Sequence, residues 1–400
     1  MRPLCVSSAL LALAACGAGA ATGPASAASS GTGGGGSTTG GGSTAGAGGT
    51  TGSTTGGAPF LPAPHPPYPT IPDVAGVVLQ APRIVTIIGA GDPELAYGFA
   101  YVDAAAASQW WLDVGQEYGL EAPLGNTRVV GPAITANLDD AALKAYVAAA
   151  VADAGVPPPQ GDTIFALFLP VGVDTSCPAT GSSSDGYHEV YDDLGDALAV
   201  VMFCGAASKD PTLMSHELME SATDPTFQGY LLAPASPRWS SSVWADTDGE
   251  VGDLCEGTAP LAVDPSGFHF DRMWSNAAVA AAAPPCGPDD AGAVDFDTSA
   301  AQGWYPGQPG TQLLIPLTGW SLAPMPAWTL KATIEARPAP GSGDGFTATL
   351  DAGTLANGAG TTLTVTVPGT AQVGDYAYVR LSSDEAGQVH TWPVGVYVSP

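Results

Sequence analysis

The sequence has few basic residues. Only 10 of its 400 residues are lysine or arginine, against 38 acids, and the formal net charge is −28. Binding to nucleic acid depends on clustered cations that neutralise phosphates, so this composition excludes a nucleic-acid-binding protein. The first 72 residues contain no acid, and the acids begin at Asp73. The negative charge therefore belongs to the regions that follow.

Long apolar runs are also missing, since no segment of 18 or more apolar residues follows the N-terminus. At the N-terminus, Arg2 precedes a short apolar segment and the sequence Leu13-Ala14-Ala15-Cys16. This pattern resembles a bacterial lipoprotein signal peptide, which predicts removal of residues 1–15 and lipidation of Cys16. An ordinary signal peptide cut at a nearby Ala-x-Ala triplet is the alternative. Both interpretations predict an exported protein, and the first anchors it to a bacterial membrane, in the periplasm or at the cell surface.

Residues 16–72 lack the apolar side chains that a core needs. They are rich in glycine, serine and threonine, and proline-rich from position 59 onward. Such a segment has little surface to bury, so we expect a disordered tether over 16–72 that holds a folded part away from the membrane.

Cysteine is sparse, with six residues in the chain. Cys5 would leave with the signal peptide and Cys16 would carry the lipid, so four cysteines remain. An even set in an oxidising compartment predicts two disulfides, with three pairings open. Pairing between sequence neighbours is our expectation, which gives Cys177–Cys204 and Cys255–Cys286. A zinc ion held by the four cysteines is not supported, because no C-x₂₋₄-C spacing occurs.

Residues 73–289 mix β-branched runs with helical periodicity. Strands are predicted at 83–88, 127–130, 163–169 and 197–203, and helices at 97–118, 140–154 and from Asp210-Pro211 to about Ala222. This order indicates an α/β domain with a mixed sheet plus helices, of the zincin-like kind. In the first helix, Trp110 and Trp111 are expected to pack against the core.

Residues 290–400 show a different pattern. Alternating apolar and polar segments separated by turn residues predict strands at 312–317, 329–335, 346–350, 361–367, 376–381 and 389–398. With no predicted helix, this region is expected to form an all-β immunoglobulin-like sandwich. It contains no cysteine and one histidine, His390, so we expect binding or spacing there rather than catalysis.

The predicted helix near 216 carries the pattern His216-Glu217-x-x-Glu220. Residues at i and i+4 share one helix face, so His216 and Glu220 are positioned to bind one ion. In H-E-x-x-H zinc enzymes the first glutamate acts as the general base, which assigns that role to Glu217. Here a glutamate replaces the second histidine, and zinc accepts a carboxylate oxygen. The alternative is a surface helix whose His and Glu side chains are solvated.

A third metal ligand is expected from a cluster of acids downstream. The cluster comprises Asp246, Asp248, Glu250, Asp253 and Glu256. So dense a cluster repels itself unless a cation or backbone N–H groups compensate. Glu250 is our first candidate and Asp253 our second. A calcium loop and a solvated acidic turn remain as alternatives, although the spacing lacks the glycine and bidentate glutamate of such a loop.

A second His-Glu pair occurs at His188-Glu189. We expect it in a loop, where the fixed geometry of a helix is absent. His188 is therefore an outside candidate for a metal ligand or a substrate contact.

Four short motifs resemble the Exordium, or phosphate-induced protein, family. They are Ser108-Gln109-Trp110-Trp111 with Tyr118-Gly119, the Ser215 to Pro225 segment, the Glu250 to Gly257 segment, and Trp274 to Pro288. The resemblance covers about residues 82–288, in the same order. It implies a secreted domain with an H-E-x-x-E metalloprotease-like signature, in a family known mainly from plant cell-wall growth. The close cysteine-proline-glycine-cysteine run of the plant members is absent around 177–204.

Two functional hypotheses follow. The first is a lipid-anchored zinc hydrolase outside the cytoplasm, of the peptidase type, in which Glu217 activates water beside a zinc ion. The second is a non-catalytic surface lipoprotein that binds cell-wall polymer and uses the acidic site for a structural metal. The missing second histidine favours the second hypothesis, and the presence of Glu217 favours the first.

Overall fold

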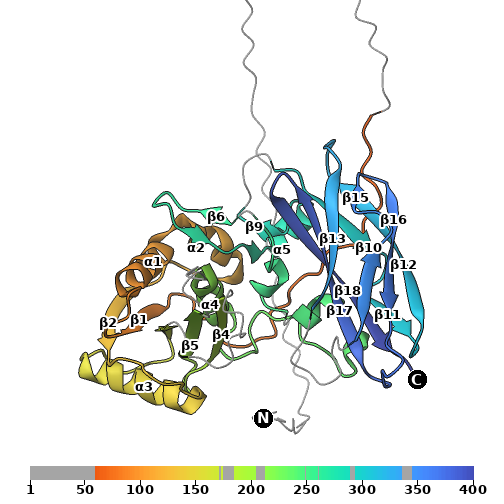
Figure 1. Ribbon diagram of the computed structural model, residues 1–400. Helices are drawn as coiled ribbons and strands as arrows, with labels where there is room; N and C mark the ends of the chain where they lie inside the picture. The colour runs from red at the N-terminus through yellow and green to blue at the C-terminus, as the bar shows by residue number, and fades with distance from the viewer. Residues whose placement is uncertain are drawn as a thin grey trace, which may run out of the picture. The chain divides into compact units, whose positions relative to one another are not determined.

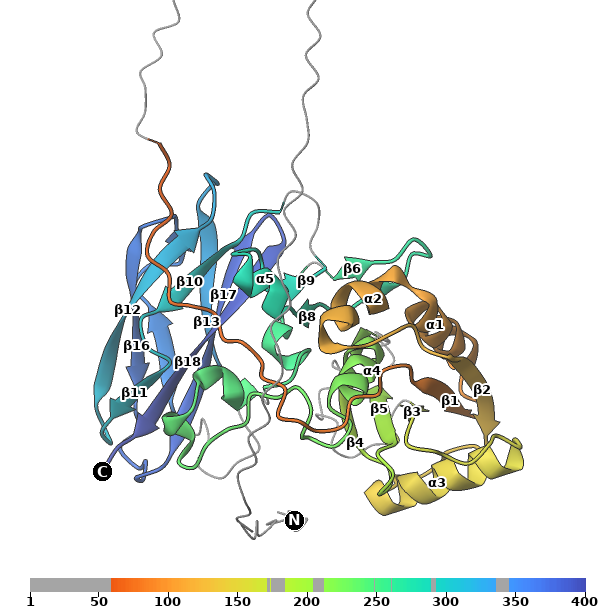
Figure 2. The same cartoon turned by 180° about the vertical axis from the view of Figure 1, so that it is seen from behind.

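The computed structural model describes residues 59–170, 173, 184–203, 212–247, 249–259, 261–288, 293–335 and 345–400 (Figures 1 and 2). The predicted signal peptide with Cys16, the tether up to residue 58, and the predicted Cys177–Cys204 pair lie outside these residues. The described chain is mostly β-structure with few helices. No helix in these ranges is long and apolar enough to cross a membrane.

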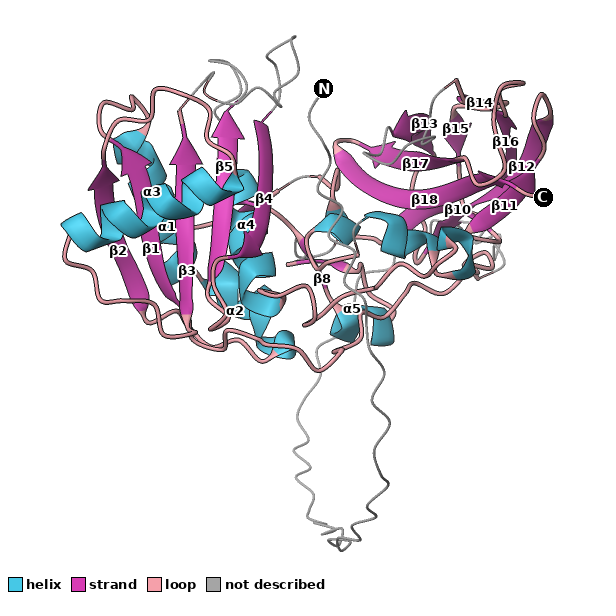
Figure 3. Ribbon diagram, turned by 90° about the horizontal axis from the view of Figure 1, so that it is seen from below, coloured by secondary structure: helices cyan, strands magenta, loops and turns pink. Residues whose placement is uncertain are grey.

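A five-stranded sheet forms the first half of the described chain, with the strand order β2-β1-β3-β5-β4 (Figure 3). The strands are β1 (Arg83–Gly89), β2 (Gly125–Gly131), β3 (Thr163–Leu169), β4 (Ser184–Val190) and β5 (Ala197–Phe203). The first four in this order pair parallel, and β4 pairs antiparallel with β5 at the edge. The four predicted strands are confirmed. β4 was not predicted, because its Ser-Asp-Gly start resembles a loop.

Helices cover both faces of this sheet. Side chains of a strand alternate between faces, and here Ile84 and Ile88 face one core while Val85 and Ile87 face another. The first core includes side chains of α1 (Leu95–Ala107), α2 (Gln109–Gly115) and α4 (Thr212–Thr223). The second includes α3 (Asp140–Asp153), which lies on the opposite side in Figure 1. A mixed sheet with helices on both faces is therefore present, and the zincin-like assignment stays a prediction.

The predicted single helix over 97–118 is broken at Ser108. Its extended backbone ends α1, and its hydroxyl accepts a hydrogen bond from the backbone N–H of Trp111 at the start of α2. The same hydroxyl donates to the carbonyl of Ala105. Serine competes for backbone groups in this way, which explains the break. Trp111 is fully buried and Trp110 packs against Phe270, as expected for core residues.

The described residues 293–335 and 345–400 form a β-sandwich of two sheets, with the strand orders β10-β12-β16-β14 and β11-β18-β17-β13-β15. The strands are β10 (Phe296–Ala300), β11 (Trp304–Gly307), β12 (Gln312–Ser321), β13 (Trp328–Glu335), β14 (Thr347–Leu350), β15 (Thr354–Leu355), β16 (Gly360–Thr366), β17 (Tyr376–Glu385) and β18 (Gln388–Val398). All six predicted strands are present. β10, β11 and β15 were missed because they are short or carry glycine and proline.

The connection between the two halves contains short elements only. These are the 3₁₀ turns η2 (Arg238–Ser240), η3 (Val243–Thr247) and η4 (Asp253–Cys255), the helix α5 (Asn276–Ala280), and the paired strands β6 (Ala262–Val263) with β7 (His269–Phe270) and β8 (Met273–Trp274) with β9 (Cys286–Gly287). A disulfide joins Cys255 to Cys286, which confirms that predicted pair.

Residues 59–72, assigned to the tether from their proline content, pack against the folded part. Ile71 is 1% exposed, and its backbone exchanges two hydrogen bonds with the Asn276 side chain. His65 and Tyr68 both contact the Asp297 carboxylate at 2.8 Å. The composition predicted a segment with little apolar surface to bury. Its few aromatic and aliphatic side chains, however, lie at positions that contact the folded part. The tether prediction therefore does not hold for 59–72.

Candidate metal centre

The helix α4 is buried on nearly every side. All its residues except Leu213 are buried. His216, Glu217 and Glu220 are 6%, 4% and 2% exposed. The alternative of a solvated helix face is therefore wrong, and the charge of these side chains must be compensated inside the protein.

His216 lies at the centre of three carboxylates. Its Nε2 is 3.1 Å from Glu220 Oε1 and 3.5 Å from Asp253 Oδ1, while its Nδ1 is 3.0 Å from Asp271 Oδ2. The backbone N–H of Asp271 donates to the hydroxyl of Ser215 at 2.9 Å. Ser215 thus holds the backbone N–H of Asp271, and His216 holds its carboxylate. A carboxylate on the second ring nitrogen is the usual support for a metal-binding histidine.

Asp271 did not stand out in the sequence. It follows a two-residue strand and shares no spacing with the H-E-x-x-E pattern. The only available signal was the general rule that a ligating histidine needs a partner for its other nitrogen.

Glu220 receives two backbone hydrogen bonds from the loop that precedes η4. Its Oε1 accepts from the N–H groups of Gly252 and Asp253 at 3.1 and 3.2 Å. A Cβ at position 252 would lie 2.7 Å from His216 Nδ1 and 2.8 Å from Glu220 Oε1. Gly252 therefore permits the loop to approach the helix closely enough for these bonds.

His188 lies on the other side of Glu220. Its Nδ1 is 3.7 Å from both Glu217 Oε2 and Glu220 Oε2, and its Nε2 is 3.7 Å from Glu250 Oε1. The ring also bonds through Nε2 to the backbone carbonyl of Asp224 at 3.2 Å and stacks on Phe227. The loop prediction for His188 is wrong, since the residue pairs with Ala199 in the β4–β5 ladder.

The alternation along β4 explains this placement. Gly186 and His188 point toward α4, and a Cβ at 186 would lie 2.7 Å from Glu217 Oε1. Tyr187 and Glu189 point the other way and reach Asp140 and Lys144 of α3. The Gly-x-His pattern therefore makes room for Glu217 and brings an imidazole to it.

Two groups of side chains have the geometry of metal ligands, and both include Glu220. One is His216, Glu220 and Asp253, and the other is His188, Glu220 and Glu250, with ligand atoms within 4.8 Å of one another in each. The predicted ligands are thus all near α4, but Asp253 and Glu250 fall in different groups. One nitrogen and two oxygens suit zinc or manganese.

Acids near the site carry shifted pKa values. Burial, together with the charges of Glu220, Asp253, Asp224 and Glu217, raises the pKa of Glu250 well above its usual range. Burial also raises the pKa of Glu217, partly offset by the two histidines. One oxygen of Asp224 is buried without a hydrogen-bond partner among the described residues. These are the properties of carboxylates gathered for a cation.

The remaining acids of the 246–256 cluster serve other contacts. Asp246 is 2% exposed and pairs with Arg238, and Glu256 pairs with Arg380 of β17. Asp248 lies outside the described residues. The alternative of a calcium loop would need Asp246 as its first ligand, and one oxygen of Asp246 pairs with Arg238 instead.

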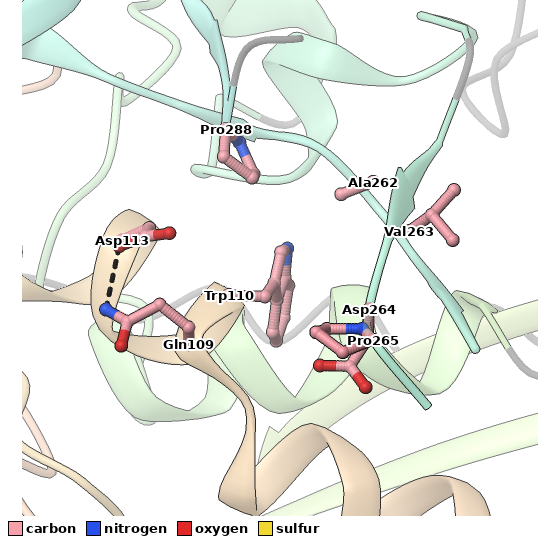
Figure 4. Close-up of a pocket in the computed structure, with 8 residues that line it drawn as sticks. All are labelled: Gln109, Trp110, Asp113, Ala262, Val263, Asp264, Pro265 and Pro288. Carbon is pink, nitrogen blue, oxygen red and sulfur yellow. Dashed lines mark hydrogen bonds between the residues drawn. The ribbon is translucent and has the colours of Figure 1, made fainter. Parts of the chain in front are cut away.

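A pocket of about 230 Å³ opens near the site but not at it. Figure 4 shows Trp110 at its middle, with lining residues Gln109, Asp113, Ala262, Val263, Asp264, Pro265 and Pro288. Trp110 donates its indole N–H to the backbone carbonyl of Asp271, the residue that supports His216. Asp271 therefore contacts a pocket-lining residue through its backbone carbonyl and His216 through its side chain.

Comparison with known proteins gives no assignment. No family model matches the chain, and no curated protein matches it. Among solved structures, a family 123 glycoside hydrolase from Clostridium perfringens shows 11% identity over 26% of this chain and 27% of that one, with a TM-score of 0.21. The titin M3 domain shows 13% identity over 26% of this chain and 97% of its own, with a TM-score of 0.17. A β-glucosidase from Listeria innocua shows 11% identity over 80% and 46%, with a TM-score of 0.16. Values this low carry no argument about function.

Proposed function

We propose that the protein is a metal-dependent hydrolase of the peptidase type, with zinc as the first candidate metal. The observation that carries the proposal is the arrangement on α4: His216 and Glu220 lie with Asp253 around one position, and Glu217 is buried beside them. The H-E-x-x-E pattern, the mixed sheet with its antiparallel edge strand, and the resemblance to the Exordium family support a zincin-like domain. Lipidation of Cys16, export and attachment to a bacterial membrane belong to the same proposal.

In this function a bound divalent ion would supply Lewis acidity. The Nε2 atom of His216 and the carboxylates of Glu220 and Asp253 would hold it, and Asp271 would keep the Nδ1 atom of His216 protonated. Glu217, buried beside these ligands, would accept the proton of the attacking water. The same group would then return the proton to the leaving amine.

Burial favours a second candidate, a structural metal in a non-catalytic surface protein. His188, His216, Glu217, Glu220 and Glu250 are all 6% exposed or less. In this case the ion would join α4, β4 and the 250–253 loop, and the surface would bind cell-wall polymer. Glu217 would then have no role in proton transfer.

Metal analysis combined with a cleavage screen separates the two candidates. The full chain and its Glu217→Gln and His216→Gln variants are assayed for bound zinc and for cleavage of a broad peptide library. A hydrolase predicts one or more zinc ions per chain, loss of zinc in His216→Gln, and a rate reduced about 10²- to 10⁴-fold in Glu217→Gln with zinc retained.

The exposed Glu121 offers a matched control, since Glu121→Gln is expected to change neither zinc content nor rate. Absence of stoichiometric zinc from the unmodified chain would overturn both candidates. Bound zinc without any cleavage would support the structural candidate.

A further inference from the structure

The two oxygens of the Glu220 carboxylate face two different histidines. Oε1 is 3.1 Å from Nε2 of His216, and Oε2 is 3.7 Å from Nδ1 of His188. Paired metal ions in enzymes lie about 3.5–4 Å apart, a separation that one carboxylate can bridge. The proposed function uses only the first of these two sides.

His188 is held in the orientation that a ligand requires. Its Nε2 bonds to the carbonyl of Asp224 at 3.2 Å, which directs Nδ1 toward Glu220. Stacking on Phe227, with ring centres 4.8 Å apart, fixes the plane of the ring. A backbone carbonyl behind a histidine is a common support for a metal ligand.

Glu250 is a buried carboxylate that accepts no hydrogen bond from the described residues. It is 6% exposed. Nε2 of His188 lies 3.7 Å from Oε1 of Glu250, which is longer than a hydrogen bond. A carboxylate buried in this way takes up a proton or is compensated by a cation.

The ionisable groups around α4 also favour a second cation. The carboxylates around α4 are Glu217, Glu220, Asp224, Glu250, Asp253 and Asp271, and the imidazoles are His188 and His216. Six carboxyl groups thus stand against two imidazoles, so there are enough oxygen ligands for more than one cation. One divalent ion at His216 would leave Glu250 and the free oxygen of Asp224 uncompensated.

From these contacts we propose that His188, Glu220 and Glu250 form a second divalent-cation site, joined through Glu220 to the His216–Glu220–Asp253 site. The centre would thus hold two ions bridged by one carboxylate. This rests on the proposed function for the first ion only. Ligands of one imidazole and two carboxylates suit zinc or manganese.

Zinc stoichiometry tests the proposal. The full chain is saturated with Zn²⁺, dialysed, and analysed for zinc per chain, and the weaker site is followed by competition with a chromophoric chelator. We expect two ions in the unmodified chain, one in His188→Gln, one in Glu250→Gln and one in Asp253→Asn. Glu220→Gln should weaken both sites by about 10- to 100-fold or more.

Two controls separate loss of a ligand from loss of the fold. His269→Gln removes an exposed histidine and should leave two ions bound. Near-ultraviolet circular dichroism should be unchanged in Glu250→Gln, whose side chain keeps the shape of the original. Mn²⁺ gives a second measurement, since two bridged ions produce a spin-coupled signal that each single-site variant should abolish.

The outcomes are distinguishable from those of the proposed function. One ion that is lost in His216→Gln and retained in His188→Gln would overturn the second site and leave the first intact. One ion that is lost in both variants would show a single site shared by the two histidines, which also overturns the proposal. Absence of any ion would overturn both proposals.

Discussion

At the scale of single residues, small side chains decide the geometry of the centre as much as the ligands do. Gly252 lets the loop donate two N–H groups to Glu220, and Gly186 leaves space for Glu217. Neither glycine has a positive φ that would require it for conformational reasons. These positions need glycine because a Cβ atom there would lie too close to neighbouring side chains.

Replacement of Gly252 by alanine should therefore disrupt the metal centre. The new Cβ would meet His216 and Glu220 below 3 Å, so the loop must move and Glu220 loses its backbone hydrogen bonds. We expect a destabilisation of about 1–3 kcal/mol and weaker zinc binding, measured by chemical denaturation and chelator competition. Gly369→Ala is the matched control, because nothing lies within 4 Å of a Cβ there. Equal effects of the two changes would contradict this role of Gly252.

His390 in the sandwich should make stability depend on pH. Burial and the charge of Arg272 lower its pKa to about 4, despite the opposing charge of Asp297. Between the ordinary value of 6.5 and pH 4, the unfolded chain binds a proton that the folded chain does not, so stability falls as the pH falls through this window.

The expected loss is about 3 kcal/mol in total, at about 1.4 kcal/mol for each pH unit. Its measurement is the free energy of unfolding of the unmodified chain and of His390→Gln between pH 7 and 4. The variant cannot take up this proton. Its free energy of unfolding should therefore fall less than that of the unmodified chain as the pH falls. A constant difference would show that His390 does not titrate in this way.

At the scale of elements, β4 and α4 act together. The strand directs Gly186 and His188 to the helix and Tyr187 and Glu189 to α3, so one edge strand supplies both faces of the sheet with polar contacts. The helix in turn is buried although it carries three ionisable side chains.

Gly186→Ala should separate the proposed role of Glu217 as general base from the proposed role of the metal ligands. The added methyl group would lie 2.7 Å from Glu217 Oε1 but is not recorded near His216. We expect zinc content to stay the same while the rate of cleavage falls by at least about 10²-fold, the lower range for loss of a general base. Zinc loss with unchanged folding would place Glu217 among the ligands instead.

The sequence predicted the individual helices and strands of this centre better than the tertiary contacts between them. The H-E-x-x-E spacing is confined to one helix, so periodicity was enough to place His216 and Glu220 on one face. His188 lies in β4 and Asp271 directly follows β7. These two strands reach His216 and Glu220 only through tertiary packing against α4, which local patterns do not encode, and the composition near His188 suggested a loop. Which of Glu250 and Asp253 faces which histidine depends on the turn at Gly252, and no local pattern encodes it.

At the scale of the whole molecule, the two halves of the described chain are tied together at several places. Arg380 of β17 bonds to the carbonyl of Glu256 at 2.6 Å, next to the Cys255–Cys286 disulfide. Ala259 pairs with Val389 of β18. The loop that carries Asp253 is therefore attached to the sandwich immediately after the metal centre.

The proline-rich segment 59–72 should contribute to stability at this scale. Ile71 is 1% exposed and Leu61 is 79% exposed in the same segment. Ile71→Ala should lower the free energy of unfolding by about 2–5 kcal/mol, whereas Leu61→Ala should have almost no effect. Denaturant titration of both variants measures this. Two small effects would mean that the segment acts only as a tether.

One core cluster extends from Ile84 of β1 to Val394 of β18 and includes side chains of α4. Because these residues exclude water together, local opening of the sandwich is coupled to the packing around α4. An ion bound beside α4 should therefore slow amide hydrogen exchange in β18, although β18 contains none of the proposed ligands.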